Sequence, residues 1–444
     1  GKNMARWGKW GWAGFLLCLA LACVLSGCGQ EEPQKLWVLT DLDYWWTSGG
    51  EAPSGAEGAQ QDFQEILAYF HGLPEDMEVE LEVLPVEEDA LNARLSRIRT
   101  EILAGGGPDV FLLSCDLPEN LWMSQERLFP NVEHALYGDF FLPLDPYLEE
   151  AQFLEWEKLT PAVMEAGRTE EGQLVLPMTY NGTLIKTSQA IPPEDLPQTW
   201  EEGITNQNPV IREGYAWAAR QAFPSLFSAV ADAKREELLL TPEELGLRVR
   251  QVWENADPLQ QTGTPVRVLR YYPQEFDLLS GEELWLSLED RDTLFPLRNT
   301  QGGVSVYITL YGAVNRNTSL PQEAFTVLDM LLSREALSGE CFWRSDGNKR
   351  GFGIYLLGSS KRGVPVHEEL FHGESNSVNY FFLDDPAFQR FSSARQEITA
   401  AYFPSNVDLA LCRAFEEWSA TPPEEREALV RDACNRVWMM LGES

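Results

Sequence analysis

The sequence predicts an α/β protein with a mainly parallel sheet, and three observations support this prediction. Short apolar runs at residues 36–40 and 110–113 have the length of buried strands. Residues 79–83 alternate Val or Leu with Glu, which is the period of a half-exposed strand. Apolar residues recur at helical spacing over 91–102. Strand and helix therefore alternate, as parallel sheets require.

The same patterns predict further helices and strands. A helix is expected near residues 61–70, and the helix over 91–102 is expected to stop at Gly105-Gly106-Gly107. Apolar runs at residues 174–178 and 304–308 predict two more strands. Each predicted helix or strand is short, and no internal repeat is present.

Three hydroxyl residues are placed to begin helices. Thr241, Ser319 and Thr421 each stand three residues before Glu or Gln, with Pro between. Such a spacing predicts capping boxes, in which the hydroxyl and the carboxyl or amide group satisfy free N–H groups reciprocally.

Length and charge limit the classes of protein. A chain of 444 residues exceeds the size at which one core stops growing, so two domains are expected. The formal net charge is −35, and so acidic a surface repels nucleic acid and anionic lipid headgroups. We expect no nucleic-acid partner and take solubility as the main role of the charge.

The N-terminal residues look like an export signal. Lys2, Arg6 and Lys9 precede an apolar stretch at residues 13–25, which is too short for a comfortable membrane span. The sequence Leu25-Ser26-Gly27-Cys28 then resembles the lipobox of bacterial lipoproteins. This resemblance implies cleavage after residue 27 and a lipid on the Cys28 thiol, with residues 28–35 as a tether. A plain secretion signal or a short buried helix is the alternative.

Cysteine and histidine give no metal site. Cys115, Cys341, Cys412 and Cys434 are far apart without zinc-type spacing, and the four His are scattered. Cys412 and Cys434 could pair across a helical hairpin or stay free buried thiols. No metal or cofactor is expected.

Four segments, in order, resemble the extracellular solute-binding proteins of ABC transporters, in the family that includes maltose- and other sugar-binding proteins. Residues 95–113 have its helix, Gly-rich break, Pro-Asp and buried strand. Residues 141–148 (FLPLDPYL) and 172–200 are similar to further family patterns. Residues 302–337 have its strand, Tyr-Gly-Ala-Val-Asn and helix. The stretch 256–280 and the insertion-like 341–377 match no family pattern.

This resemblance implies two discontinuous α/β lobes joined by crossing strands, with a ligand cleft between them, as in type II periplasmic binding proteins. The expected N-terminal lobe comprises residues 36–182 and about 295–337. The expected C-terminal lobe comprises residues 183–294 and about 338–444. The resemblance further implies a monomer on the extracellular face of the membrane that closes on its ligand and is recognised by an ABC permease. No catalytic residue is required.

Ligands of parallel-sheet domains bind beyond the carboxyl ends of the strands. Asp41, directly after the first strand, is one candidate. Further predicted contacts come from strand ends, from the expected crossings and from the segment after the late helix: Asp43, Tyr44, Trp45, Trp46, Ser114, Asp116, Tyr180, Asn181, Trp285 and Trp343. Aromatic faces stack on sugar rings while Asp and Asn bind hydroxyls. Of the 15 Trp, 12 follow the predicted cleavage point, and this number favours a carbohydrate.

Other tryptophans fit structural positions. Trp37, Trp217, Trp253 and Trp438 follow apolar patterns and are expected in the core, and Trp200 belongs to a structural motif of the family.

Three alternatives remain open. Arg344, Lys349 and Arg350 form a basic cluster that could meet a non-sugar solute such as a peptide or an anionic metabolite. A sensor-associated receptor would have the same sequence features as a transport protein. A glycoside-processing lipoprotein enzyme would need two carboxylates about 5–9 Å apart, and no spacing identifies such a pair.

Overall fold

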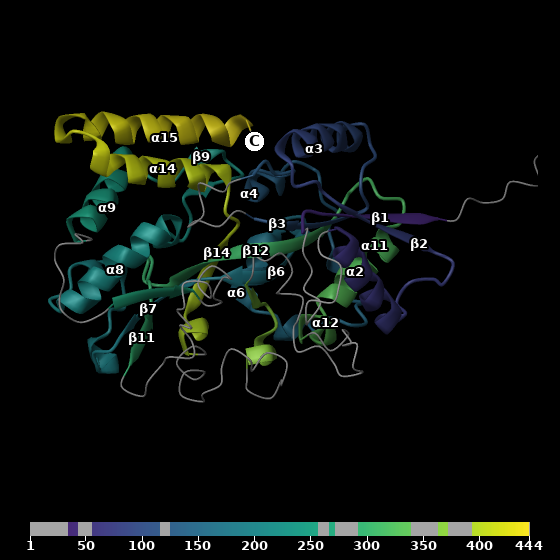
Figure 1. Cartoon of the computed structure of the whole chain (residues 1–444), viewed down its shortest axis with the longest axis horizontal. Helices are drawn as coiled ribbons and strands as arrows, with labels where there is room; N and C mark the ends of the chain where they lie inside the picture. Colours follow the sequence, from purple (N-terminus) through teal and green to yellow (C-terminus); the bar gives the residue numbers. More distant parts are fainter. Residues whose placement is uncertain are drawn as a thin grey trace, which may run out of the picture.

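The computed structural model describes residues 34–42, 56–115, 125–255, 266–270, 292–338, 363–371 and 393–443 (Figure 1). The predicted signal and Cys28 lie outside these residues. Within them, no helix has the length and apolar character needed to cross a membrane.

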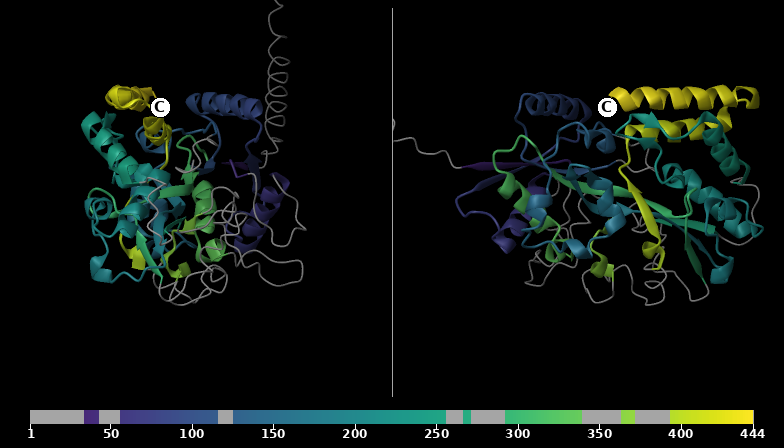
Figure 2. Two further views of the ribbon diagram at one scale, coloured as in Figure 1. Left: turned by 60° about the vertical axis from the view of Figure 1, so that its left-hand side comes forward. Right: turned by 180° about the vertical axis from the view of Figure 1, so that it is seen from behind.

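The first lobe begins with the predicted parallel strands. Strands β1 (Lys35–Thr40) and β2 (Glu78–Val83) pair in parallel, and β1 pairs in parallel with β3 (Val110–Ser114) on its other side. Helices α2 (Ala56–Phe70) and α3 (Glu88–Leu103) connect them and cover opposite faces of the sheet (Figures 1 and 2). The predicted alternation and the parallel pairing are confirmed.

The same sheet continues with strands from later in the chain. Strands β6 (Val175–Asn181) and β12 (Val304–Val314) join it, as do the shorter β13 (Val364–Pro365) and β14 (Ile398–Tyr402). Among the described residues the strand order is β13-β6-β12-β3-β1-β2, with β14 paired to β12. Strand β12 runs antiparallel to β3 and β6, so the sheet is mixed.

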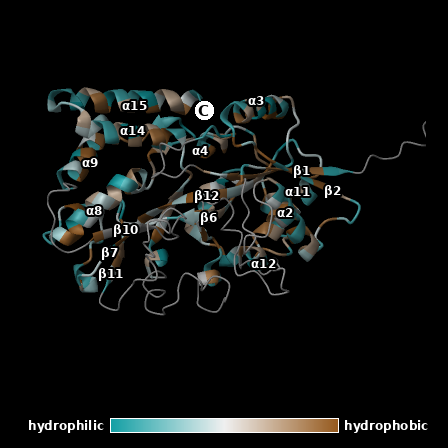
Figure 3. Ribbon diagram, viewed as in Figure 1, coloured by the Kyte–Doolittle hydropathy of each residue, from teal (hydrophilic) through white to brown (hydrophobic). Residues whose placement is uncertain are grey.

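The second lobe is built on a smaller sheet. Strand β7 (Thr183–Thr187) pairs antiparallel with β10 (Val266–Arg270) and with β11 (Thr293–Pro296). Its helices include α7 (Trp200–Ile204), α8 (Pro209–Gln221), α9 (Pro242–Asn255), α14 (Asn406–Ala420) and α15 (Arg426–Glu443). These helices carry both hydrophobic and hydrophilic stretches (Figure 3), as expected for helices with one face on a core.

Further helices and strands complete both lobes. They are α4 (Val132–Ala135), α5 (Asp145–Leu148), α6 (Pro161–Met164), β4 (Arg168–Thr169), β5 (Gly172–Gln173), β8 (Ala231–Asp232), β9 (Glu237–Leu238), α11 (Pro321–Leu331) and α12 (Arg334–Ser338).

Two separate hydrophobic clusters form the cores of the lobes. With the exception of Leu294, which belongs to the first cluster, membership passes from one cluster to the other at residues 184–185, again at 297–304, and finally at 403–407. The segment 363–371 contributes Val364, Val366 and Leu370 to the first cluster. We therefore propose that the first lobe extends beyond residue 337 and that the third crossing lies at 403–407. The other expected lobe boundaries stay a prediction.

Helix α3 ends where the glycine run predicts. Gly105 and Gly107 have φ of 92° and 96°, a left-handed conformation that side chains disfavour. The Asn315 side-chain amide donates hydrogen bonds to the carbonyls of Gly106 and Pro108, at 3.0 and 2.8 Å. The break between helix and strand is thus held by a residue far away in the sequence.

Of the three predicted capping boxes, the hydroxyl half of one is confirmed. Thr241 Oγ1 accepts a hydrogen bond from the Glu244 N–H at 3.1 Å. The prediction for Ser319 is wrong, because α11 has no side-chain cap there. The prediction for Thr421 is also wrong, since its hydroxyl donates to the Glu417 carbonyl at 2.8 Å and thus binds the end of the preceding helix.

The structure also tests the predictions for the cysteines and for two of the tryptophans. Cys412 and Cys434 are buried thiols that do not form a disulfide with each other, and Cys115 is also a buried thiol. Trp200 is fully buried, as expected. Trp438 is 64% exposed, so its predicted core position is wrong. Its helix packs on the second core through other positions, and an apolar residue on a two-sided helix does not by itself identify the buried face.

The carboxylate of Asp329 joins two segments of the first lobe. This residue of α11 is 3% exposed, and its carboxylate accepts hydrogen bonds from the N–H groups of Gln152, Phe153 and Leu154 at 2.8, 3.1 and 2.7 Å. We expect Asp329→Ala to lower the free energy of unfolding by about 3 kcal/mol or more, because three backbone donors lose their acceptor. Urea unfolding measures this loss.

The matched control is Asp432→Ala, at an exposed position of α15. It should change the free energy of unfolding by less than about 0.5 kcal/mol. Equal losses in the two variants would contradict a structural role for Asp329.

Candidate functional site

A groove of about 720 Å³ lies between the two lobes. One wall is the start of α3 with residues 125–130, and the other is the start of α14 with the end of α15. Helices α3 and α15 lie on the same side of the molecule (Figures 1 and 2). The lining residues are Val86, Glu88, Leu91, Asn92, Gln125, Glu126, Arg127, Pro130, Asn406, Leu409, Ala410, Arg413, Arg436 and Met440.

The carboxyl ends of β1 and β3 meet at a polar cluster beside this groove. Asp41 follows β1 and accepts hydrogen bonds from the Ser114 N–H at 3.0 Å and the Ser114 hydroxyl at 2.8 Å. Arg127, which lines the groove, donates from Nη1 to Asp41 at 2.8 Å and to the Ser114 hydroxyl at 2.9 Å. Parallel strands end at one edge of a sheet, so residues distant in sequence are brought together there.

This cluster fixes an arginine at the groove. The side chains of Asp41 and Arg127 are 14% and 11% exposed, so the ion pair is largely shielded from water. A shielded, hydrogen-bonded pair of this kind holds its geometry better than a surface pair. Asp41 is therefore occupied by protein partners, and Arg127 is the member of the cluster that faces the groove.

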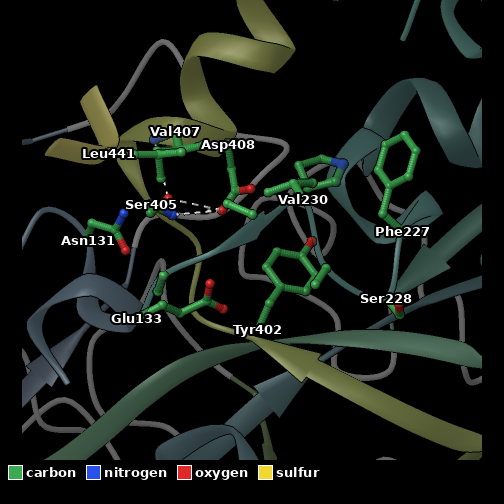
Figure 4. Close-up of a pocket in the computed structure, with 14 residues that line it drawn as sticks. Asn131, Glu133, Phe227, Ser228, Val230, Tyr402, Ser405, Val407, Asp408 and Leu441 are labelled. Atoms are coloured by element: carbon green, nitrogen blue, oxygen red, sulfur yellow. Dashed lines mark hydrogen bonds between the residues drawn. The ribbon is translucent and has the colours of Figure 1, made fainter. Parts of the chain in front are cut away.

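Two carboxyl groups line a small cavity nearby (Figure 4). Glu133 comes from α4 of the first lobe and Asp408 from the first turn of α14 in the second. The cavity of about 20 Å³ has space for about one water molecule, so it holds no solute of the size of a sugar. Its residues instead form a polar joint between the lobes.

Burial sets the charge of this joint. Burial and, to a smaller extent, the neighbouring Asp408 raise the pKa of Glu133 to about 8, against the opposing effect of the Phe403 N–H. Burial also raises the pKa of Asp408 to about 7, although Ser405 donates hydrogen bonds from its N–H at 2.9 Å and its hydroxyl at 3.3 Å. Both groups therefore favour the neutral, protonated form over a wider pH range than exposed carboxyls.

The described groove lining is charged and aliphatic. It includes Glu88 and Glu126 from the first lobe and Arg413 and Arg436 from the second, and none of the described lining residues is aromatic. Groups of three or more His, Cys, Asp or Glu that could hold a metal are absent from the described part of the chain.

Comparison with known proteins was informative at the level of three-dimensional structure. No family model and no curated protein sequence matches the chain. Among solved structures, it is similar to a cyclic α-maltosyl-1,6-maltose binding protein from Arthrobacter globiformis, with a TM-score of 0.51 and 12% identity over 92% of this chain and 99% of that one. The chain has the solute-binding-protein fold.

Two further sugar-binding proteins share this solute-binding fold. The sugar-binding protein MalE from Xanthomonas citri has a TM-score of 0.51 and 14% identity, covering 92% of this chain and 98% of that one. A periplasmic oligogalacturonide binding protein from Yersinia enterocolitica has a TM-score of 0.51 and 13% identity, covering 92% and 99%. The predicted two-lobed α/β class is thus confirmed. Identities this low establish the fold alone.

The structure describes three of the predicted contact residues, Ser114, Tyr180 and Asn181. Ser114 lies in the cluster beside the groove, together with Asp41. Tyr180 and Asn181 are both 0% exposed within β6 and do not line the groove. The Tyr180 hydroxyl accepts a hydrogen bond from Arg395 Nε at 2.9 Å. The remaining predicted contacts lie outside the described residues: Asp43, Tyr44, Trp45, Trp46, Asp116, Trp285 and Trp343.

Sequence reasoning missed the arginines of the groove. Arg127 lies thirteen positions after Ser114, and Arg413 and Arg436 belong to two different helices of the second lobe. The chain has 34 Lys and Arg residues, and no motif or spacing distinguishes these three. Only the packing of α14 and α15 opposite α3 brings them to one groove.

The carboxyl joint predicts a pH dependence of stability. Both pKa values are raised above the usual 4.5 and 3.8, so their contribution to stability is complete below pH of about 4 and is lost as the pH rises towards 7–8. We expect the free energy of unfolding to fall by roughly 4 kcal/mol from pH 6 to pH 8, with contributions from both groups. Chemical denaturation at both pH values measures this difference.

Glu133→Gln should flatten this dependence by removing one titrating group, whereas Glu424→Gln, at an exposed position, should leave it unchanged. An unchanged pH dependence in Glu133→Gln would show that Glu133 is ionised in the folded protein at pH 6.

Proposed function

We propose that the protein is an extracellular solute-binding protein that holds a carbohydrate between its lobes and delivers it to an ABC importer. The observation that supports this most directly is the interlobe groove, whose lining comes from both cores. The names of the similar proteins point the same way, since they bind cyclic maltosyl-maltose, oligogalacturonide and sugars.

Hinge closure is the mechanism that this arrangement favours. A ligand touching both walls gains contacts only when the lobes approach, and this differential affinity shifts the population towards the closed state. Two side-chain contacts between the lobes are exposed: the His134 ring nitrogen lies 3.0 Å from Glu236, and Lys234 pairs with Glu170 at 2.5 Å, both with at least one well-exposed partner. Such exposed contacts are weak and oppose lobe movement little, whereas the buried carboxyl joint of Glu133 and Asp408 is the contact that a change of the interlobe angle has to accommodate.

The groove offers groups for both parts of a sugar. Leu91, Leu409 and Met440 present aliphatic surface to the C–H face of a ring, and Asn92 and Asn406 are amide partners for hydroxyls. The aromatic contacts predicted from the sequence, above all Trp45 and Trp46, remain part of this proposal. No step of binding or release breaks a covalent bond, so the proposed function needs no catalytic residue.

The proposal includes a lipid anchor on Cys28 that holds the protein at the extracellular face of the membrane, within reach of its permease. Its basis is the lipobox-like sequence at residues 25–28. Detergent phase partitioning tests it: the full chain should enter the detergent phase and Cys28→Ala should remain in the aqueous phase. Equal partitioning of both would contradict the anchor.

Thermal unfolding of residues 29–444 tests the function. We expect a saccharide from a panel of mono- and oligosaccharides to raise the melting temperature, with amino acids and short peptides as the comparison. A ligand at 100 times its Kd adds about 2.7 kcal/mol to the free energy of unfolding. Leu409→Asp should abolish the response, because it places a charge on the aliphatic wall of the groove.

The matched control is Leu239→Asp, which changes a 52% exposed leucine that does not line the groove. It should keep the response of the unaltered protein. A response to amino acids or peptides alone would overturn the carbohydrate assignment and leave a binding protein for another solute.

A further inference from the structure

The groove reverses the charge balance of the chain. The whole sequence has 69 acidic and 34 basic residues. The groove lining has three arginines, Arg127, Arg413 and Arg436, against two glutamates, Glu88 and Glu126. Arg127 is already paired with Asp41, so Arg413 and Arg436 are the lining arginines whose charge can attract an entering anion.

The two glutamates have roles outside the groove. Glu88 lies in the first turn of α3, where a carboxylate stabilises the positive end of the helix dipole. Glu126 lies 3.5 Å from Arg99 and is paired with it. Both carboxylates are thus accounted for by partners within the first lobe.

Arg413 and Arg436 differ from nearly all other arginines of the protein. Of the arginine side chains that the structure describes, Arg97, Arg413 and Arg436 form no hydrogen bond, ion pair or aromatic contact with another described residue. Two of these three line the groove. Their guanidinium groups are exposed, so their binding capacity is available to a molecule that enters.

The two helices fix the positions of these arginines. Cys412 and Cys434, which are 4% and 6% exposed, belong to the second core on α14 and α15 and precede the arginines by one and two positions. Leu409 lies one turn before Arg413, and Met440 lies one turn after Arg436. The second wall therefore combines two guanidinium groups with aliphatic surface.

Such a wall suits a ring compound that carries carboxylates. The planar guanidinium fork matches a carboxylate and binds it in a bidentate manner, and the aliphatic side chains accept the C–H face of a sugar ring. Neutral sugars would leave both guanidinium groups without a charged partner. Resting on the proposed function, we propose that the groove selects acidic saccharides of the uronic acid class, with Arg413 and Arg436 as the residues that read the carboxylates.

Calorimetric titration of residues 29–444 with a matched pair of ligands tests this specificity. The pair is trigalacturonate and its fully methyl-esterified form, which has the same rings and linkages without the charge. We expect the acid to bind at least tenfold more tightly than the ester. Arg413→Gln and Arg436→Gln should each weaken binding of the acid about tenfold or more and leave binding of the ester unchanged, since each removes a charge-assisted hydrogen bond.

Arg97→Gln is the matched control, because Arg97 is equally without a partner among the described residues but lies outside the groove lining. It should bind the acid as the unaltered protein does. Unchanged melting temperatures of the three variants without ligand would show that all of them fold.

The outcomes separate the two proposals. Equal affinity for acid and ester, or tight binding of a neutral saccharide such as maltotriose alone, would overturn the acidic specificity and leave the carbohydrate-binding function in place. Binding of the acid that Arg413→Gln and Arg436→Gln do not weaken would overturn the role of these residues. Absence of binding to every saccharide tested would overturn both.

Discussion

Strand β12 is the constraint on which the rest of the structure depends. All eleven residues from Val304 to Val314 are buried, and the strand pairs with β3, β6 and β14. Because it is held on both sides along its length, it ties the first parallel strands to the segments that carry the chain into the second lobe. Gly312 is part of this constraint: a side chain there would meet Leu328 at 2.5 Å, so helix α11 could not pack as closely on the strand.

The position of β12 determines where the groove and its polar cluster lie. With β12 fixed against β3, the carboxyl ends of β1 and β3 face the second lobe, and Asp41 and Ser114 meet there and orient Arg127. The return of the chain after β14 brings α14 and α15 to the opposite wall. A groove with walls from two cores can change its width when the lobes move, whereas each wall stays rigid because its own core is closely packed.

The sequence predicted most of the first lobe because its signals are local. The period-2 pattern of β2, the apolar run of β3 and the glycines after α3 depend on neighbours within a few positions. The cap at Ser319 failed because α11 has Leu320 at its cap position, and the cap at Thr421 failed because its hydroxyl binds the end of the preceding helix. The prediction for Trp438 failed because its helix buries a different face. The groove arginines could not be predicted, since their significance arises only from the packing of segments about three hundred residues apart. Most of the aromatic contacts predicted from strand ends stay predictions, because their residues lie outside those described.

The central claim is that the two walls approach each other around a bound saccharide. Distances between spin labels on residues 29–444 measure this directly, with labels on Ser96→Cys of α3 and Asn435→Cys of α15, both exposed positions, in a Cys341→Ser background. The described native cysteines are buried and should not react. Saturation with trigalacturonate or another saccharide that raises the melting temperature should shift the distance distribution to shorter values. An unchanged distribution at saturation would contradict closure and indicate a rigid groove.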